Sequence, residues 1–285
     1  MRVSRYVLCA LAAAASPALA QVPPLQLPAA SPKASVTQKV GLTDVTVRYS
    51  RPAVAGRKVW GGLVPLGEVW RTGADENTTL SFTSPVTVGG KTLPAGTYGL
   101  HTIPGEKEWT VILSTQANAW GSYSYDPKED AVRFTAVPKE GPLEERLLFT
   151  LADPTDRSVA VTLAWEKLRL SFPVEVDTKA VVLGSLREQL RGLPRFGWQG
   201  WNGAAAWCVK NDTALDQAEE WVNRSISMNR NFTNQSTKAA LLEKKGDAKG
   251  AAELREKALA LATEPELNQY GYQLLGQKKV DEAIR

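Results

Sequence analysis

The stretch RPAVAGRKVWGGLVPLGEVWRTGADENTT, residues 51–79, lies between segments of regular pattern and follows no regular pattern itself. Its apolar residues show neither the period of 3.6 typical of a helix nor the alternation typical of a strand. A long glycine-rich segment buries little apolar surface to offset its backbone entropy, so such a segment is usually functional or disordered. Disordered segments are poor in aromatic residues, and Trp60 and Trp70 therefore indicate an ordered loop that carries a binding site.

Around this loop the sequence has the pattern of short β-strands. Runs rich in Val, Thr, Leu and Phe are separated by Gly, Pro and Asp turns, with no helical segment between them. We expect an all-β antiparallel sandwich, jelly-roll-like, over residues 36–177. The predicted strands are residues 45–49, 80–82, 86–88, 91–93, 97–101, 109–113, 131–136, 147–151, 159–165 and 168–174.

After Asp177 the pattern becomes helical. Similar residues recur at a spacing close to the 34 residues of a tetratricopeptide repeat, as in Val209 and Leu242 or Ala218 and Ala251. We therefore expect an all-α region of tetratricopeptide-like helical repeats over residues 178–285. The predicted helices are residues 180–190, 203–209, 215–228, 235–244, 248–262 and 266–275.

The N-terminus has the three parts of a secretory signal peptide. Arg2 and Arg5 precede an apolar run over residues 6–15, and small residues at 18 and 20 form a cleavage site. Residues 1–20 should be removed, and the Pro-rich residues 21–35 predict a disordered lead-in. No later run is apolar for long enough to span a bilayer, so we expect a soluble protein that is periplasmic or secreted.

Composition argues against several classes of partner and cofactor. The formal net charge of +4 falls to +2 without Arg2 and Arg5, and the absence of a dense basic run argues against a nucleic-acid partner. Without the signal peptide, the chain has one cysteine, Cys208, and one histidine, His101. We therefore expect no internal disulfide, no zinc site of the Cys/His type and no cofactor.

The central motifs resemble a known family. They read R-P-x-x-x-G-R-x-V-x-G-G-L-V-P-x-G-x-V-W-R-T-G-A-D-E-x-T-T, then L-P-A-G-T-Y-G-L-H-T-I-P-G-E-x-E-W-T-V-I-L, then A-W-G-S-Y-S-Y-D. Over about residues 36–177 they are similar to a secreted bacterial family known as domain of unknown function 2911. The resemblance implies a β-domain, often followed by tetratricopeptide-like repeats, and an extracytoplasmic address, but it brings no established activity.

The resemblance also marks particular positions. Asp75 and His101 depart from the family pattern, which more often has Asn and an apolar residue there. The positions that the family motif includes are Arg51, Arg57, Trp70, Arg71 and Glu76.

The three arginines of the loop are candidates for binding an anion. A planar guanidinium donates two parallel hydrogen bonds to a carboxylate, sulfate or phosphate, which makes Arg51, Arg57 and Arg71 candidate ligand-binding residues. The alternative is structural, because an ordered loop needs its polar groups satisfied. In that case the arginines pair with acidic residues of the same loop, namely Glu68, Asp75 or Glu76.

Aromatic residues form two further candidate sets. The first set offers a platform for a sugar ring or a peptide, or else a small core beneath the loop, to which we expect Trp70 to belong. This set is Trp60, Trp70, Trp120, Tyr123 and Tyr125. In the helical region, one set lines a partner groove on the first repeat or seals the seam with the β-sandwich. This second set is Trp198, Trp201 and Trp207.

Acid/base catalysis is a weaker interpretation of the loop. Asp75 and Glu76 are adjacent, and adjacent residues of an extended segment point to opposite sides, so the fold would have to supply a second carboxylate such as Asp126. No serine-hydrolase elbow, zinc-protease motif or phosphate loop occurs. His101 lies within an apolar strand, as structural histidines often do.

The sequence thus predicts an exported binding or scaffolding protein that is not an enzyme. Its β-sandwich presents the loop of residues 51–79 to a small anionic or sugar ligand, and its helical region binds a protein partner. The alternative is a carbohydrate-active hydrolase or lyase in which Glu76 is the general acid/base.

Overall fold

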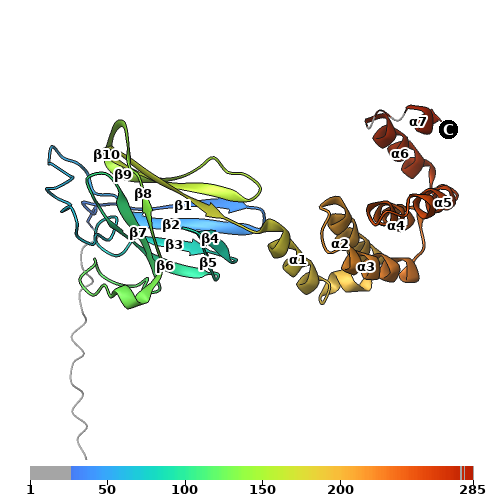
Figure 1. Cartoon of the computed structure of the whole chain (residues 1–285), viewed down its shortest axis with the longest axis horizontal. Helices are drawn as coiled ribbons and strands as arrows, with labels where there is room; N and C mark the ends of the chain where they lie inside the picture. The colour runs from blue at the N-terminus through green and yellow to red at the C-terminus, as the bar shows by residue number, and fades with distance from the viewer. Residues whose placement is uncertain (1–26, 277, 279, 285) are drawn as a thin grey trace, which may run out of the picture.

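The computed structural model describes residues 27–276, 278 and 280–284. A β-sandwich is followed by a helical region, and helix α1 (Thr178–Gln189) lies between the two (Figure 1). The predicted fold class, all-β antiparallel followed by all-α, is confirmed. The expected signal peptide, residues 1–20, and residues 21–26 of the expected lead-in lie outside the described residues.

The sandwich consists of two antiparallel sheets. The first has the strand order β1-β2-β3-β6-β7-β8 and the second has the order β5-β4-β10-β9. Apolar residues alternate along the strands and meet in one shared core, as Val45 and Val47 do on β2. The strands are β1 (Lys33–Val40), β2 (Thr43–Ser50), β3 (Thr79–Phe82), β4 (Val86–Val88), β5 (Lys91–Leu93), β6 (Gly96–Ile103), β7 (Trp109–Ser114), β8 (Asp130–Ala136), β9 (Lys139–Ala152) and β10 (Ser158–Glu175).

Three strands differ from the sequence prediction. β1 begins at Lys33, inside the predicted lead-in, because it pairs with β2 along its whole length. β10 is one strand where two were predicted, since a register shift around Glu166, whose φ is 52°, absorbs the irregularity as a bulge. β9 extends back through Pro142, which an edge strand tolerates because its outer N–H groups need no partner.

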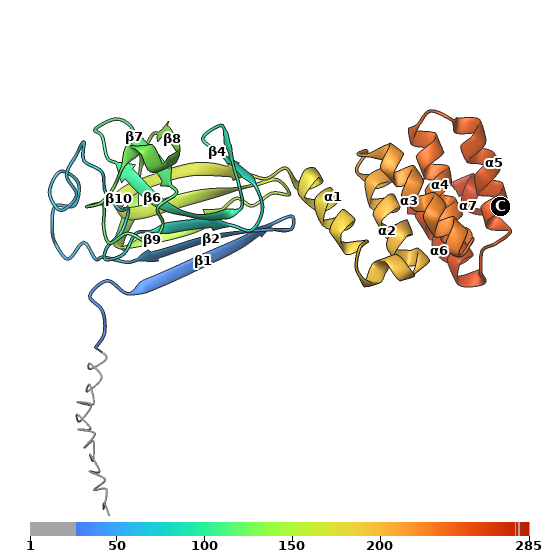
Figure 2. The ribbon, with the colours of Figure 1, turned by 90° about the horizontal axis from the view of Figure 1, so that it is seen from below.

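Four tryptophans hold the loop between β2 and β3 on the sandwich. Trp60 and Trp70 of the loop pack against Trp109 of β7 and Trp165 of β10, each of which is 1% exposed. The ring centroids of Trp60 and Trp109 are 4.8 Å apart, and those of Trp70 and Trp165 are 5.8 Å apart. Trp70 and Thr102 also exchange two backbone hydrogen bonds. The loop is therefore anchored, at the end of the sandwich farthest from the helices (Figure 2).

The helical region is built from hairpins. α2 packs on α3, α4 on α5 and α6 on α7, and the first helices begin at Trp198, Phe232 and Glu264, so the unit repeats after 34 and then 32 residues. No described helix is long and apolar enough to cross a membrane. The bounds are α2 (Trp198–Lys210), α3 (Leu215–Met228), α4 (Phe232–Lys244), α5 (Ala248–Leu259), α6 (Glu264–Gly276) and α7 (Val280–Ile284).

Small residues lie where these helices touch. Ala218 and Ser225 of α3 and Ala251 and Ala258 of α5 are each fully buried, which lets neighbouring helices approach closely. Cys208 of α2 is also fully buried, and burial raises the pKa of its thiol. The helices therefore enclose a core of their own, separate from that of the sandwich.

Two tryptophans should differ sharply in their contribution to stability. Trp109→Ala removes a buried partner of Trp60 and Trp70, and we expect it to lower the free energy of unfolding by about 3–5 kcal/mol. Trp120 is 62% exposed, so Trp120→Ala should change the free energy of unfolding by no more than about 0.5 kcal/mol. Urea unfolding of both variants measures the difference. Equal losses would mean that the tryptophan cluster does not anchor the loop.

Candidate functional site

The three arginines of the loop have different environments. Arg51 donates from Nε to the carbonyl of Leu147 at 2.9 Å, and Arg57 donates to the carbonyls of Val54 and Ala53. Both therefore hold the loop through backbone groups. The expected pairing with Glu68, Asp75 or Glu76 does not occur among the described residues.

Arg71 is the exception. The structure gives its guanidinium no hydrogen bond or ion pair with any described residue, and its Nε is buried without a partner. Its neighbour Trp70 packs against the core and donates from Nε1 to the carbonyl of Gly73 at 3.1 Å, as expected for a residue that anchors the loop. Asp75, which has a φ of 60°, does not reach Arg71. Arg71 is thus a half-buried cation whose guanidinium donates no hydrogen bond to the described residues.

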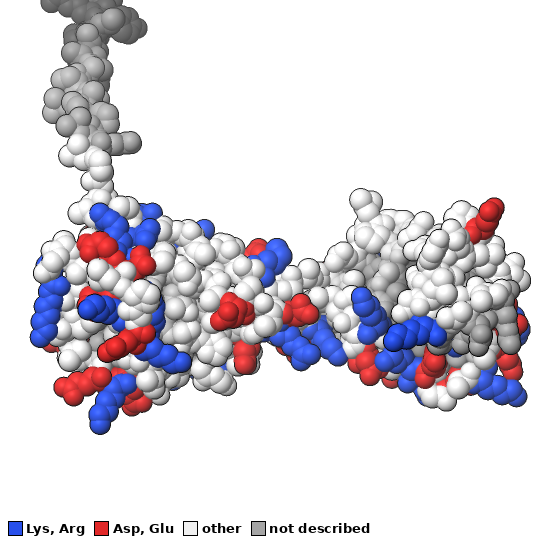
Figure 3. All heavy atoms as spheres, turned by 90° about the horizontal axis from the view of Figure 1, so that it is seen from above, with Lys and Arg blue, Asp and Glu red and all other residues white. Residues whose placement is uncertain are grey.

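Glu76 lies at the edge of a hollow of about 580 Å³ on the sandwich. Lys33 of β1 binds its carboxylate at 2.7 Å, and this hydrogen bond lowers the pKa of Glu76. A general acid needs a raised pKa, and Glu76 is the one acidic residue among those that line the hollow. The described residues therefore give the catalytic alternative no carboxylate pair around Glu76. Acidic and basic side chains both lie on the end of the sandwich that faces away from the helices (Figure 3).

The aromatic candidates separate into two kinds. Trp120 is 62% exposed and Tyr123 is 88% exposed, on the segment between β7 and β8. Tyr125 is half-buried and donates its hydroxyl to Asp130, which also binds Arg133. Burial, and then the Asp130 carboxylate, raise the pKa of Tyr125 to about 12. Trp120 and Tyr123 are thus open to a ligand, whereas the hydroxyl of Tyr125 is engaged within the fold.

His101 lies in a buried series of polar side chains that the sequence pattern does not predict. Its Nε2 is 3.1 Å from the side-chain amide of Asn77, and its Nδ1 is 2.9 Å from the hydroxyl of Ser122. Burial lowers the pKa of His101 to about 4, and the Asp130 carboxylate partly offsets this effect. The ring is therefore neutral at pH 7 and ties the loop of Asn77 to the segment of Ser122. No short stretch of sequence predicts these two contacts, because the residues that each contact joins are more than 20 positions apart.

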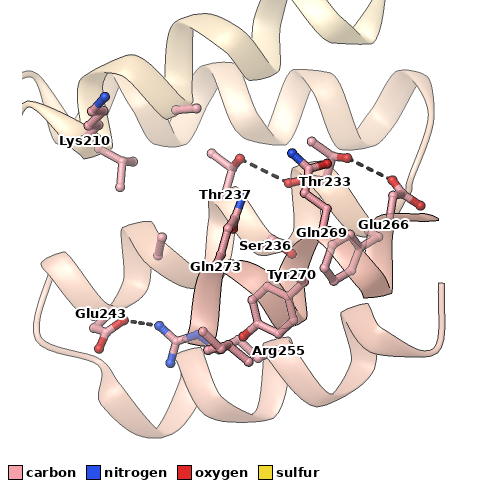
Figure 4. A pocket seen from close by; sticks show the side chains of 15 residues that line it. Lys210, Thr233, Ser236, Thr237, Glu243, Arg255, Glu266, Gln269, Tyr270 and Gln273 are labelled. Atoms are coloured by element: carbon pink, nitrogen blue, oxygen red, sulfur yellow. Dashed lines mark hydrogen bonds and ion pairs between the residues drawn. The ribbon is translucent and has the colours of Figure 1, made fainter. Parts of the chain in front are cut away.

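The helical region has a groove of about 780 Å³ lined by α2, α4 and α6, the first helices of the three hairpins, with Arg255 of α5 (Figure 4). Arg255 binds Glu243 at one end, and Thr233 donates to Glu266 at the other. Between them the lining is rich in hydroxyl and amide side chains, which are Ser236, Thr237, Gln269 and Gln273. The residues predicted to line a partner groove were instead three tryptophans of α2.

Those tryptophans lie elsewhere on α2. Trp201 and Trp207 pack against the helical core, as Leu183 and Leu186 of α1 also do, and Trp201 donates from Nε1 to a backbone carbonyl at 2.9 Å. Trp198 is half-buried at the start of α2. None of the three is among the residues that line the groove. No cluster of three or more potential metal ligands occurs within the part of the chain that the structure describes.

Comparison with known proteins places the β-sandwich in a family. Residues 31–174, half of the chain, match the model of a family described as a protein of unknown function (DUF2911). No curated protein and no solved structure matches the chain.

His101 should stay neutral far below its ordinary pKa. His101 binds a proton near pH 6.5 in the unfolded chain but only near pH 4 in the folded chain. The contribution of the neutral ring to the free energy of unfolding is therefore fully present above pH 6.5 and is lost as the pH falls toward 4. Between pH 7 and pH 4.5 we expect the free energy of unfolding of the parent chain to fall by about 2–3 kcal/mol more than that of the His101→Gln variant. NMR of the single imidazole and urea unfolding measure both effects. An imidazole that titrates near pH 6.5 in the folded protein would contradict the prediction.

Arg51 and Arg71 should respond differently to the same substitution. Arg51→Met leaves the Leu147 carbonyl without its donor and should lower the free energy of unfolding by about 1–2 kcal/mol. Arg71→Met removes a guanidinium that satisfies no protein acceptor, so we expect a smaller loss or a gain. Thermal and urea unfolding compare the two variants. A larger loss for Arg71→Met would show that Arg71 has a structural partner.

Proposed function

Because the chain belongs to this family, whose function is unknown, we propose from its own geometry that it is an exported binding protein whose helical region holds an extended segment of a partner protein. The observation that carries the proposal is the groove formed by α2, α4 and α6. Stacked helical hairpins place their first helices on one face, and such faces are common sites of protein interaction. The repeat distances of 34 and 32 residues support a tetratricopeptide-like array.

The chemistry of the groove suits a polypeptide in extended conformation. Ser236 and Gln273 line the groove, hydroxyl and amide side chains can each donate and accept hydrogen bonds, and an extended backbone offers both kinds of partner. Phe232 and Tyr270, whose ring centroids are 5.7 Å apart, add an aromatic surface for an apolar side chain. Such a site recognises backbone first and side chains second.

Export is supported by the sequence alone. The basic, apolar and small-residue parts of residues 1–20 have the order of a signal peptide. We accordingly place the partner in the periplasm or outside the cell. Recovery of the same periplasmic proteins by the mature chain with and without residues 178–285 would argue against the helical region as the partner surface.

A matched pair of substitutions tests the groove. Ser236 lines the groove, whereas Ser227 is exposed on α3 outside the lining, so Ser236→Arg fills the groove and Ser227→Arg does not. Peptides selected on the mature chain from a random 12-residue display library should bind Ser236→Arg at least about tenfold more weakly, which is about 1.4 kcal/mol. Calorimetry should show Ser227→Arg within about twofold of the parent chain. Failure to enrich any peptide, or equal weakening by both substitutions, would refute the proposal.

A further inference from the structure

We propose that Arg71, Trp120 and Tyr123 form a second binding site, on the β-sandwich, for a sugar that carries a carboxylate. The site goes beyond the proposed groove, since it lies in the other part of the chain. It uses the one arginine of the loop of residues 51–79 whose guanidinium donates no hydrogen bond within the described residues.

The state of Arg71 is the first step. Five buried side-chain atoms lack a hydrogen-bond partner among the described residues, and Nε of Arg71 is the one that belongs to a charged group. Arg71 as a whole is half-buried, so its guanidinium remains accessible on one side. Partly buried charged groups without partners are costly and are rarely left so without a reason. A ligand carboxylate would pair with this charge through the terminal nitrogens, which are not among the buried atoms.

The second step is that the aromatic segment is held next to Arg71. At one end, Glu76 and Trp120 form a β-bridge, and the N–H of Asn77 donates to the Ala119 carbonyl at 3.2 Å. At the other end, the Ser122 hydroxyl lies 2.9 Å from His101. The exposed rings of this segment therefore lie on an anchored backbone, which limits the entropy that a ligand must remove on binding.

Gly121 shows how close the two parts are. A Cβ at Gly121 would lie 2.9 Å from the ring of Tyr123 and 3.5 Å from Nη1 of Arg71, so the ring and the guanidinium flank the same point. Gly121 has a φ of 69°, a conformation in which glycine is unstrained. The absence of a side chain at Gly121 therefore lets the Tyr123 ring and Nη1 of Arg71 approach the same point.

The ligand chemistry follows from these two groups. A guanidinium fork binds the two oxygens of a carboxylate, and an exposed aromatic face stacks on the apolar face of a sugar ring. A uronic acid carries both features on one ring. A neutral sugar would use only the aromatic contact, and a small inorganic anion would use only Arg71.

The test uses the mature chain with trigalacturonate and its fully methyl-esterified form, which lacks the charges. Calorimetry should show binding of trigalacturonate and at least about tenfold weaker binding of the ester. Arg71→Gln and Trp120→Ala should each weaken trigalacturonate binding to a similar degree. The side-chain Nε–H signal of Arg71 in ¹H–¹⁵N spectra should shift on titration of the parent chain.

Two controls locate the site. Arg48 lines the neighbouring hollow, so Arg48→Gln should leave binding within about twofold, and Ser236→Arg should leave it unchanged because that residue lies in the helical groove. The proposal is overturned if trigalacturonate does not bind, if the ester binds equally well, or if Arg48→Gln weakens binding more than Arg71→Gln. If Arg71→Gln fails to fold, the Trp120→Ala variant and the Arg71 signal of the parent chain decide the question.

Discussion

Trp60 and Trp70 pack against Trp109 and Trp165, and this packing orders the loop of residues 51–79 at one end of the sandwich. A loop of this length and glycine content gains little from its own contacts, so its order has to come from the body of the fold. Two large side chains packed against the core supply that order at two points. Insertion of Trp70 also fixes the position of Arg71, the next residue along the chain.

The same constraint reaches the segment between β7 and β8. The anchored loop presents Glu76 to Trp120 and Asn77 to His101, and His101 in turn contacts Ser122. Two stretches without regular structure thus order one another through a few directed contacts. Because the imidazole stays neutral over the physiological range, these contacts do not change with ordinary variation in pH.

Local pattern in the sequence predicts most of the fold. The helix expected at residues 215–228 matches α3 residue for residue, because its apolar periodicity and boundaries are local properties. The prediction fails where long-range pairing overrides a local turn signal, as at Glu166 in β10. The bulge there is stabilised by the neighbouring strand β9, which no short window of sequence contains.

The candidate sites were less predictable for the same reason. Arg51, Arg57 and Arg71 look alike in the sequence, and what separates them is the position of partners such as the Leu147 carbonyl, 96 residues from Arg51. The family match covers residues 31–174 without assigning an activity, so it does not separate them either. In the helical region the spacing of repeats indicated which helices align, while the polar character of the shared face emerged only from the packing.

Burial of Cys208 has a consequence for the chemistry of the chain in an oxidising environment. The thiol lies inside the helical core, and burial keeps it protonated, so neither a peroxide nor a disulfide reaches a thiolate there while the helices stay packed. Oxidation of this cysteine therefore requires the helices to open first. An oxidised Cys208 would thus mark a molecule whose helices have opened at least once, even after the helices have closed again.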